Sequence, residues 1–252
     1  MLKVRIIPTL LHKDVGLVKG KKFDSWRRTG SAMQQIKVYN LRGVDELVFS
    51  DISASKQNRG PNFEMIDDLA DECFMPLTVG GGISNIEQAR ETLKVGADKV
   101  SINTGALKNP DLITEIANKF GTQCVVVAID YKIYSNGELE VYSHSGSEPT
   151  GINPIEFAKK AADYGAGEIL LTSIDRDGTY EGYDNDTIAK ISDNVSIPVI
   201  ASGGAGSYQH MLDAIKIGKA SAIAAASIYH FTDLTPLLAK KFLNKNNIPV
   251  RL

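Results

Sequence analysis

The sequence contains little cysteine and no excess of charge of either sign. Its only two cysteines, Cys73 and Cys124, stand far apart among 252 residues and form no C-x-x-C pair. So few thiols exclude a disulfide framework and suit a reducing compartment, so we expect a cytoplasmic protein. The formal net charge of −2 provides no basic field. We therefore expect no nucleic-acid partner.

Long apolar runs and the common catalytic and metal-binding motifs are also missing. No run reaches the roughly 18–20 apolar residues of a membrane-spanning helix, and the first apolar run is too short for a signal peptide, so we expect no membrane partner. The four histidines show no metal-ligand spacing, and we expect no metal and no cofactor. A Ser-His-Asp arrangement, a nucleophile elbow and a Walker loop are absent. His12 alone among the histidines is a candidate for acid–base chemistry.

An internal repeat is the most informative feature that the sequence does contain. Three segments return at one offset of 122 residues: Met75–Gly82 as Ile197–Gly204, Lys94–Gly96 as Lys216–Gly218, and Gly43–Leu47 as Gly165–Ile169. Because all three keep the same offset, the two halves look like copies of one unit.

Short apolar runs alternate with amphipathic stretches along the chain. We expect strands near residues 4–10, 46–51, 76–80, 98–102, 123–129, 168–172, 197–201 and 221–225. We expect helices near residues 31–41, 62–72, 85–95, 110–119, 153–164, 183–192, 207–216 and 233–242. The strands show little polar alternation, which is typical of strands buried on both faces. Eight strand–helix units in two copies predict an α/β fold: a single (β/α)8 TIM barrel domain over residues 1–252 with a half-barrel two-fold repeat. A doubly wound sheet is the alternative, and it would accommodate the repeat poorly.

Two connections are long for barrel loops. They cover about residues 15–30, with Lys19 and Trp26, and residues 131–152. The second carries Asn136-Gly137, a strong hairpin turn signal. Both follow the carboxyl ends of strands, where barrel active sites form. We therefore expect both segments to cover a ligand.

Glycine pairs end two strands at equivalent places in the repeat. Gly80–Gly82 and Ser202–Gly204 each precede a helix, so their backbone N–H groups can hold phosphate. With the polar residues that end neighbouring strands, the phosphate-binding candidates are Gly82, Asn103, Thr104, Gly178, Gly204 and Ser227. Two such turns predict a phosphorylated small molecule with a phosphate at each end. The alternative is that the glycines only form tight turns.

Charged residues stand at both ends of the predicted strands. Four carboxylates lie at the carboxyl ends, where they can serve as general acids or bases or can anchor loops: Asp51, Asp130, Asp175 and Asp177. Four further charges occupy early or central strand positions: Arg5, Glu46, Lys99 and Glu168. Charges inside a core are costly unless they are paired. These four therefore form either a ring across the base of the barrel or an exposed rim.

Several of these motifs make the chain similar to a known family. It resembles the cyclase subunit of imidazole glycerol phosphate synthase over essentially its whole length, through Arg5–Pro8, Asp45–Val48, Thr78–Ile83, Gly96–Thr104, Thr172–Thr179 and Ile197–Gly206. The resemblance implies a ribulosyl substrate with two phosphates and a glutaminase (amidotransferase) partner on the N-terminal face of the barrel. It also implies that ammonia passes through the barrel to two aspartates at the top.

The resemblance assigns roles to individual residues. Asp130 is one of the two catalytic aspartates, Lys19 lies on a mobile active-site loop, and Asp98 helps to couple the partner. The salt-bridged ammonia gate consists of Arg5, Glu46, Lys99 and Glu168. Behind the gate we expect a passage lined by small or polar groups such as Thr78, Ser101 and Thr172.

The chain departs from the family pattern at the other catalytic position. The usual Leu-Asp-Val-Lys-Asp-Gly reads Leu10-Leu11-His12-Lys13-Asp14-Val15, so Leu11 replaces an aspartate. General acid–base catalysis contributes roughly 10²–10⁴ in rate, and a leucine cannot transfer a proton. The altered motif resembles a divergent branch of the family linked to surface-polysaccharide (lipopolysaccharide) gene sets, in which an amidating enzyme accepts the ammonia.

The sequence therefore predicts an ammonia-conducting synthase subunit with impaired cyclase chemistry. One alternative is a working cyclase–lyase of histidine biosynthesis that recruits another acid, such as Asp14 or His12. Another is a partner-binding scaffold without any passage, against which the four retained gate charges argue.

Overall fold

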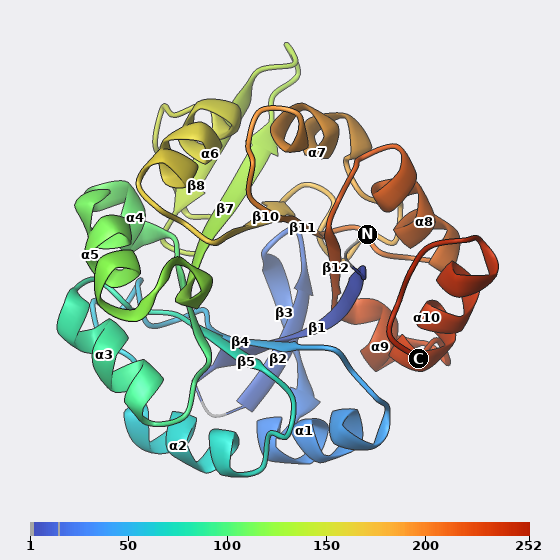
Figure 1. Cartoon of the computed structure of the whole chain (residues 1–252), viewed down its shortest axis with the longest axis horizontal. Coiled ribbons are helices and arrows are strands. Elements are labelled where there is room, and N and C mark those ends of the chain that lie inside the picture. Colours follow the sequence, from blue (N-terminus) through green and yellow to red (C-terminus); the bar gives the residue numbers. More distant parts are fainter. Residues whose placement is uncertain (1–2, 15) are drawn as a thin grey trace.

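Eight parallel strands form a closed barrel in the centre of the molecule (Figure 1). The computed structural model describes residues 3–14 and 16–252. The barrel strands are β1 (Arg5–Lys13), β4 (Leu47–Asp51), β5 (Leu77–Gly80), β6 (Lys99–Ile102), β7 (Val125–Ile133), β10 (Glu168–Ser173), β11 (Val199–Ser202) and β12 (Ala222–Ala225). Each pairs with the next, and β12 pairs with β1. The predicted (β/α)8 fold is confirmed, and the doubly wound sheet is excluded because such a sheet has two free edges.

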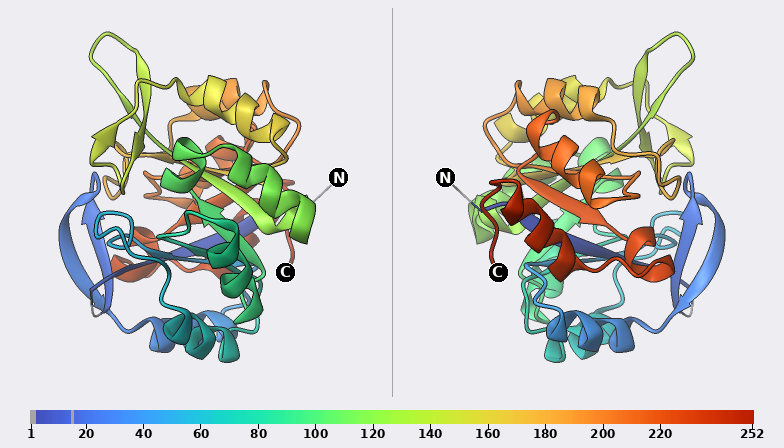
Figure 2. Two further views of the ribbon diagram at one scale, coloured as in Figure 1. Left: turned by 90° about the vertical axis from the view of Figure 1, so that its left-hand side faces the viewer. Right: turned by 90° about the vertical axis from the view of Figure 1, so that its right-hand side faces the viewer.

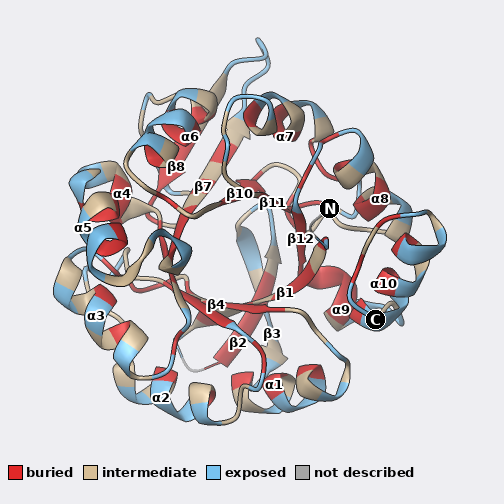
Figure 3. Ribbon diagram, in the orientation of Figure 1, coloured by how far each residue is buried: buried red, intermediate tan, exposed pale blue. Residues whose placement is uncertain are grey.

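Helices surround the barrel and bury one face each against it (Figure 3). The long ones are α1 (Ala32–Leu41), α2 (Phe63–Asp71), α3 (Ile86–Lys94), α5 (Asp111–Phe120), α6 (Pro154–Asp163), α7 (Asn185–Ser192), α8 (Tyr208–Lys216) and α10 (Pro236–Lys245). Shorter turns are α4 (Thr104–Lys108), α9 (Ser227–Phe231) and the 3-10 turn η1 (Thr122–Cys124). Local sequence fixes where several of them begin: the Asn85 side chain accepts a hydrogen bond from Gln88 N at the start of α3. Among the described residues, no helix has both the length and the apolar character needed to cross a bilayer.

The strand registers reproduce the sequence repeat. Leu47 pairs with Leu77 in the first half, and Ile169 pairs with Val199 in the second, at the offset of 122 residues. Further along, Thr78 pairs with Lys99 but Ile200 pairs with Ala222, so one additional residue raises the offset to 123. Asn103 and Thr104 therefore correspond to Ala226 and Ser227. The backbone angles agree, with φ −115° and ψ −81° at Asn103 and φ −133° and ψ −69° at Ala226.

The two long connections are β-ribbons at the same end of the barrel (Figure 2). The long connection expected at residues 15–30 contains two strands that the sequence did not predict: β1 runs on to Lys13, and β2 (Gly16–Lys21) and β3 (Asp24–Gly30) form an antiparallel ribbon that pairs with it. In the second half, β8 (Leu139–Ser143) folds back on β7 around the predicted Asn136-Gly137 turn, and β9 (Glu148–Pro149) pairs with β8. The ribbons lie opposite the end that carries the two chain termini.

Candidate active site

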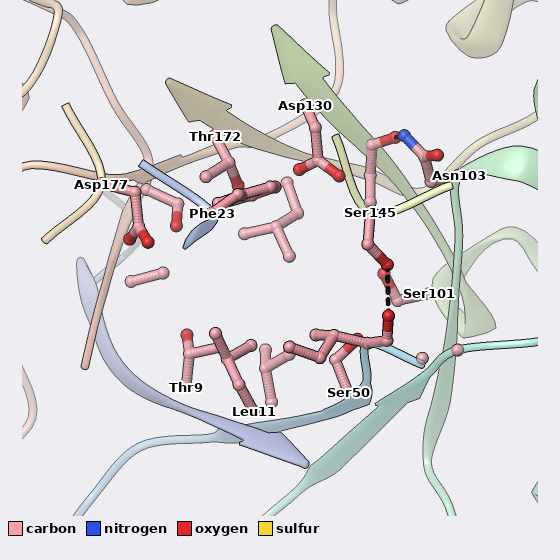
Figure 4. Close-up of a pocket in the computed structure, with 18 of the residues that line it drawn as sticks. Thr9, Leu11, Phe23, Ser50, Ser101, Asn103, Asp130, Ser145, Thr172 and Asp177 are labelled. Atoms are coloured by element: carbon pink, nitrogen blue, oxygen red, sulfur yellow. Dashed lines mark hydrogen bonds between the residues drawn. The ribbon is translucent and has the colours of Figure 1, made fainter. Parts of the chain in front are cut away.

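A pocket lies at the carboxyl ends of the barrel strands (Figure 4). Its floor is apolar and consists of Val48, Ala128, Leu170 and Ala224. Its walls carry polar side chains that end the strands, among them Thr9, Ser50, Ser101, Asn103, Asp130 and Thr172. The ribbons and the loops beside them supply its upper part, with Lys19, Phe23, Trp26 and Ser145. Both long segments were expected to cover a ligand, and residues of both line the pocket. No sequence pattern singled out Phe23 or Ser145 as lining residues.

Asp130 and Leu11 occupy equivalent positions in the two half-barrels. Leu11 of β1 pairs with Ser50, and Asp130 of β7 pairs with Thr172, which follows Ser50 at the repeat offset of 122 residues. The two side chains point into the cavity from opposite sides (Figure 4). The pocket is therefore arranged for a pair of side chains that face each other, and only one of them is an acid.

Asp130 is a carboxyl group that exchanges its proton near neutral pH. Burial raises its pKa to about 7, the charge of Asp177 adds to the increase, and a hydrogen bond from Thr172 opposes it. An acid with a pKa near the working pH can both give and accept a proton. Asp130 thus suits the catalytic role that the resemblance implies.

The other three predicted carboxylates are held by structural partners. For Asp51, burial by itself would raise the pKa, but hydrogen bonds from Ser53 and Arg59 outweigh burial and lower it. Asp175 accepts a hydrogen bond of 2.8 Å from Ile133 N and so anchors the β7–β8 ribbon. Asp177 forms an ion pair with Lys19.

The two residues proposed to replace the missing acid do not line the pocket. His12 lies on the outer side of β1, where its ring centroid is 5.8 Å from that of Phe49. Burial lowers the pKa of His12. Asp14 is exposed in a turn with φ +56°. The idea that His12 or Asp14 takes over from Leu11 is therefore wrong, because strand alternation and the turn direct both side chains away from the cavity. Val15 of the same motif lies outside the described residues.

Lys19 is on a strand, which corrects the expectation of a loop. Its side chain is 4% exposed, and its Nζ lies 2.9 Å from both carboxylate oxygens of Asp177. Lys22 N also donates a hydrogen bond of 2.8 Å to Asp177 O. These contacts tie the β2–β3 ribbon to the turn that follows β10, over the mouth of the pocket.

Both glycine turns line the pocket, and tight packing alone accounts for their glycines. Gly82 has φ +76° and Gly204 has φ +109°. A Cβ at Gly82 would lie 2.5 Å from the Arg59 carbonyl oxygen, and one at Gly204 would lie 2.1 Å from that of Gly182. Thr104 and Ser227 line the same pocket at equivalent places beside these turns. Their symmetric placement supports phosphate binding, which stays a proposal.

The two other phosphate candidates also have structural partners. The Asn103 amide donates to the carbonyl oxygens of Ala128 and Tyr142 at 3.1 and 3.2 Å, which holds the β7–β8 ribbon beside β6. Gly178 has φ +70°, and a Cβ there would lie 2.3 Å from the Gly20 carbonyl oxygen. Both residues still line the pocket.

At the opposite end of the barrel, the four predicted charges form a closed ring of ion pairs. Arg5 contacts Glu46 at 2.7 Å and Glu168 at 2.8 Å, and Lys99 contacts the same two carboxylates at 3.0 and 3.1 Å. The predicted ring is confirmed, and the exposed-rim alternative is excluded. Burial by itself would lower the pKa of Arg5, but Glu168 and Glu46 raise it. The function of the ring as a gate remains a proposal.

Asp98 lies at the same end of the barrel, one residue before β6. Its Oδ2 accepts a hydrogen bond of 2.8 Å from Leu77 N, at the start of β5. This contact gives Asp98 a structural role in joining two strand starts. A role in coupling a partner stays a proposal.

Comparisons with known proteins agree with this arrangement. The model of a family described as histidine biosynthesis protein matches residues 5–235. The chain belongs to this family. It is 51% identical over 252 residues to a protein of Chloroherpeton thalassium and 52% identical over 252 residues to one of Chlorobium luteolum, with 100% of each chain covered. Both relatives are named imidazole glycerol phosphate synthase subunit HisF. The chain is thus of the HisF type that its motifs indicated.

In the described part of this HisF-type barrel, the three residues named for a passage of small or polar groups lie at two different levels. Thr78 donates a hydrogen bond of 2.9 Å to Glu46 and so belongs to the ring, whereas Ser101 and Thr172 line the pocket at the other end. Between these levels lies an apolar cluster of Ile7, Val48, Val126, Ala128, Leu170, Ile200, Ala222 and Ala224. Alternation along each strand directs these side chains inward, so the middle level is apolar and includes the small Ala128, Ala222 and Ala224. The passage itself stays a prediction. Any path from the ring to the pocket passes among these side chains.

Proposed function

We propose that this HisF-type chain is the synthase subunit of a glutamine amidotransferase and that its own cyclase chemistry is impaired. The observation that carries the proposal is Leu11, which stands opposite Asp130 at the equivalent position of the other half-barrel. A mechanism with two aspartates has here only one group that can transfer a proton. His12 and Asp14 point elsewhere, and Asp51 and Asp177 are paired with cations.

The base of the barrel supports a partner that supplies ammonia. Both relatives are named as subunits, which fits a glutaminase on the N-terminal face. The ring of Arg5, Glu46, Lys99 and Glu168 separates that face from the interior, and Asp98 lies beside it. Ammonia is small and uncharged, so an apolar layer is a smaller obstacle to it than to an ammonium ion or to water.

The pocket supports a ligand with a phosphate at each end. One phosphate binds at Gly82 and Thr104, and the other binds at Gly178, Gly204 and Ser227, on opposite sides of Asp130 and Leu11. With the cyclase step weakened, the ammonia serves another acceptor, and the divergent motif around Leu11 favours surface-polysaccharide amidation.

A working cyclase–lyase of histidine biosynthesis is the second candidate. It is favoured by the family description and by the two relatives that are about half identical to the chain. Asp130, with a pKa of about 7, would then carry out the proton transfers alone.

Turnover of the ribulosyl bisphosphate substrate with free ammonium separates the two candidates, because it does not require the glutaminase. We expect Leu11→Asp to raise turnover by about 10²–10⁴-fold over the wild type, since it restores a general acid–base group. Leu11→Asn is the matched control. Its side chain has the shape of aspartate but cannot act as an acid, so turnover should stay low. Asp130→Asn in the Leu11→Asp background should abolish the gain. A wild type that is as fast as the Leu11→Asp variant would show that the chain is a working cyclase.

A further inference from the structure

A second cavity lies against the first glycine turn, beside the active-site pocket. The two share five lining residues: Ser55, Gly82, Ile83, Thr104 and Gly105. The second cavity has a volume of about 260 Å³, which is room for several water molecules. Beyond the shared turn it is lined mainly by polar and cationic side chains, namely Asn58, Arg59, Gln88, Lys108, Asn109 and His144. None of these residues has a role in the function proposed above.

His144 fixes the position of Lys108 at the edge of this cavity. Lys108 Nζ lies 3.2 Å from His144 Nε2. An ammonium group can only donate hydrogen bonds, so Nε2 accepts and the ring proton is on Nδ1. Nδ1 lies 2.8 Å from a carboxylate oxygen of Glu148 and can donate to it. The His144 backbone N–H also donates to Thr104 Oγ1 at 3.0 Å, which holds this arrangement next to the first phosphate turn.

Lys108 is exposed, and among the described residues it has no carboxylate in direct contact. In the described part of the chain, no carboxylate oxygen lies within 4.0 Å of its ammonium group. Arg59, in contrast, contacts Asp51 at 2.7 Å. An ordered cation without a carboxylate partner, beside donor amides and a glycine turn, is suited to bind an anion.

The second half-barrel shows that the charge is not a consequence of the repeat itself. The counterpart of Arg59 at the offset of 122 is Glu181, and the counterpart of Lys108 at the offset of 123 is Phe231. The same architecture therefore has Glu181 and Phe231 at the places of the two cations. The cations beside the second turn come from other positions: Arg176 packs against Gly204, and Arg27 lies 4.6 Å over the Phe231 ring. The two phosphate turns are thus built for different groups.

We propose that this cavity is an anion subsite for the outer phosphoryl group of a diphosphate whose inner phosphoryl group lies on the Gly82–Thr104 turn. The inference rests on the phosphate site proposed above. Because the cavity and the pocket share the turn, the second anionic group must be joined closely to the first, as in a diphosphate ester. Lys108 donates to the outer group, and His144 and Glu148 are positioning residues that hold Lys108. The Gly204–Ser227 turn has no lysine or arginine at the positions of Arg59 and Lys108, and we assign it a single phosphate.

Binding of inorganic phosphate and inorganic pyrophosphate to the whole chain, measured by calorimetry at constant ionic strength, tests the proposal. We expect the wild type to bind pyrophosphate about ten-fold more tightly than phosphate, the gain from one hydrogen bond to a charged group. Lys108→Gln should remove this preference and leave phosphate affinity within about two-fold, whereas Lys108→Arg should retain it. Lys94→Gln, which removes the same charge at the far end of α3, should change neither affinity.

The possible results distinguish the subsite from the phosphate turns. Phosphate binding with a pyrophosphate affinity that Lys108→Gln leaves unchanged would overturn the subsite and leave the turns standing. Loss of binding of both anions in Lys108→Gln would also overturn it, because Lys108 would then serve the turn itself. A wild type that binds neither anion would overturn both proposals.

Discussion

Asp130 links the acid–base chemistry of the pocket to the stability of the protein. Its pKa is raised from an ordinary value of 3.8 to about 7, mainly by burial. Near pH 4 the carboxyl keeps its proton in the folded state and begins to lose it in the unfolded state. As the pH rises from there to 7, the unfolded state alone becomes ionised, and folding stability falls. Above pH 7 both states are ionised and the penalty stays constant. A charge that costs stability at the mouth of a barrel is typical of a functional residue.

We therefore predict that Asp130→Asn stabilises the protein at pH 8 relative to pH 4. The amide stays neutral at both pH values, so the difference in melting temperature between variant and wild type should increase across this window. Thermal unfolding followed by circular dichroism at pH 4, 6 and 8 measures it. Asp67→Asn, at an exposed position of α2, is the control and should show little trend. A difference that is the same at every pH would mean that Asp130 is not buried as a neutral acid.

At the scale of elements, the base ring joins strands that begin far apart in the sequence. Glu46, directly before β4, is the least exposed residue of the ring, with 3% of its side chain exposed. It contacts Arg5, Lys99 and Thr78. Arg5 is 24% exposed, so the ring is wet on one side and dry on the other. The loss of folding stability on removing one charge should therefore depend on which of the four residues is changed.

We predict that Glu46→Gln lowers the free energy of unfolding by about 3 kcal/mol, because it leaves Arg5 and Lys99 with one carboxylate between them in a largely dry place. Urea denaturation of the isolated chain measures this loss. Glu91→Gln breaks exposed ion pairs on α3 and should cost less than about 1 kcal/mol. Equal costs for the two variants would indicate that water screens the ring as fully as the surface.

The β2–β3 ribbon is the other element on which the site depends. It is held by the Lys19–Asp177 ion pair and by close packing of Gly178 against the Gly20 carbonyl oxygen. The ribbon supplies Lys19, Phe23 and Trp26 to the pocket. Its attachment to the turn after β10 therefore determines how well the pocket is covered.

We predict that Gly178→Ala loosens the ribbon, because the new Cβ would lie 2.3 Å from the Gly20 carbonyl oxygen. Limited trypsin digestion should then cut faster after Lys21 and Lys22, which are exposed at the ribbon turn. Gly137→Ala is a matched control, since Gly137 also has a positive φ of +86° but nothing lies within 4 Å of its Cβ position. Equal cleavage in both variants would mean that backbone strain alone, and not the contact with the ribbon, is responsible.

At the scale of the whole molecule, the two-fold repeat places two glycine turns on opposite sides of one pocket. The strand registers agree between the halves, so the turns are equivalent in backbone geometry as well as in sequence. What differs between the halves is the chemistry of single positions, such as Leu11 and Asp130.

We predict two bound anions in crystals grown with sulfate or phosphate. One should lie near Gly82 and Thr104, and the other near Gly178, Gly204 and Ser227, because a glycine turn beside a hydroxyl side chain occurs twice. Crystallographic soaks at increasing sulfate concentration test this expectation. Turns that stay empty at high concentration would remove the basis for a ligand with two phosphates.

Much of this molecule follows from patterns that are local in the sequence. Apolar runs at regular spacing determine the strands, one repeat offset determines the half-barrels, and Asn136-Gly137 determines the second ribbon. Each of these depends on the chemistry of neighbouring residues or on a comparison of the chain with itself. The ring of charges could also be predicted as one of two alternatives, because isolated charges in buried strands need partners.

The tertiary structure decided the features that depend on residues distant in sequence. Gly16–Lys21 reads as a polar, glycine-rich loop and becomes a strand only because β1 extends to meet it. Lys19 is held by Asp177, and the barrel axis is filled by apolar side chains from six strands. Leu11 faces Asp130 only because the barrel closes. Sequence patterns fix which element forms, but the register between elements fixes which side chains meet, and that register is set by packing across the whole barrel.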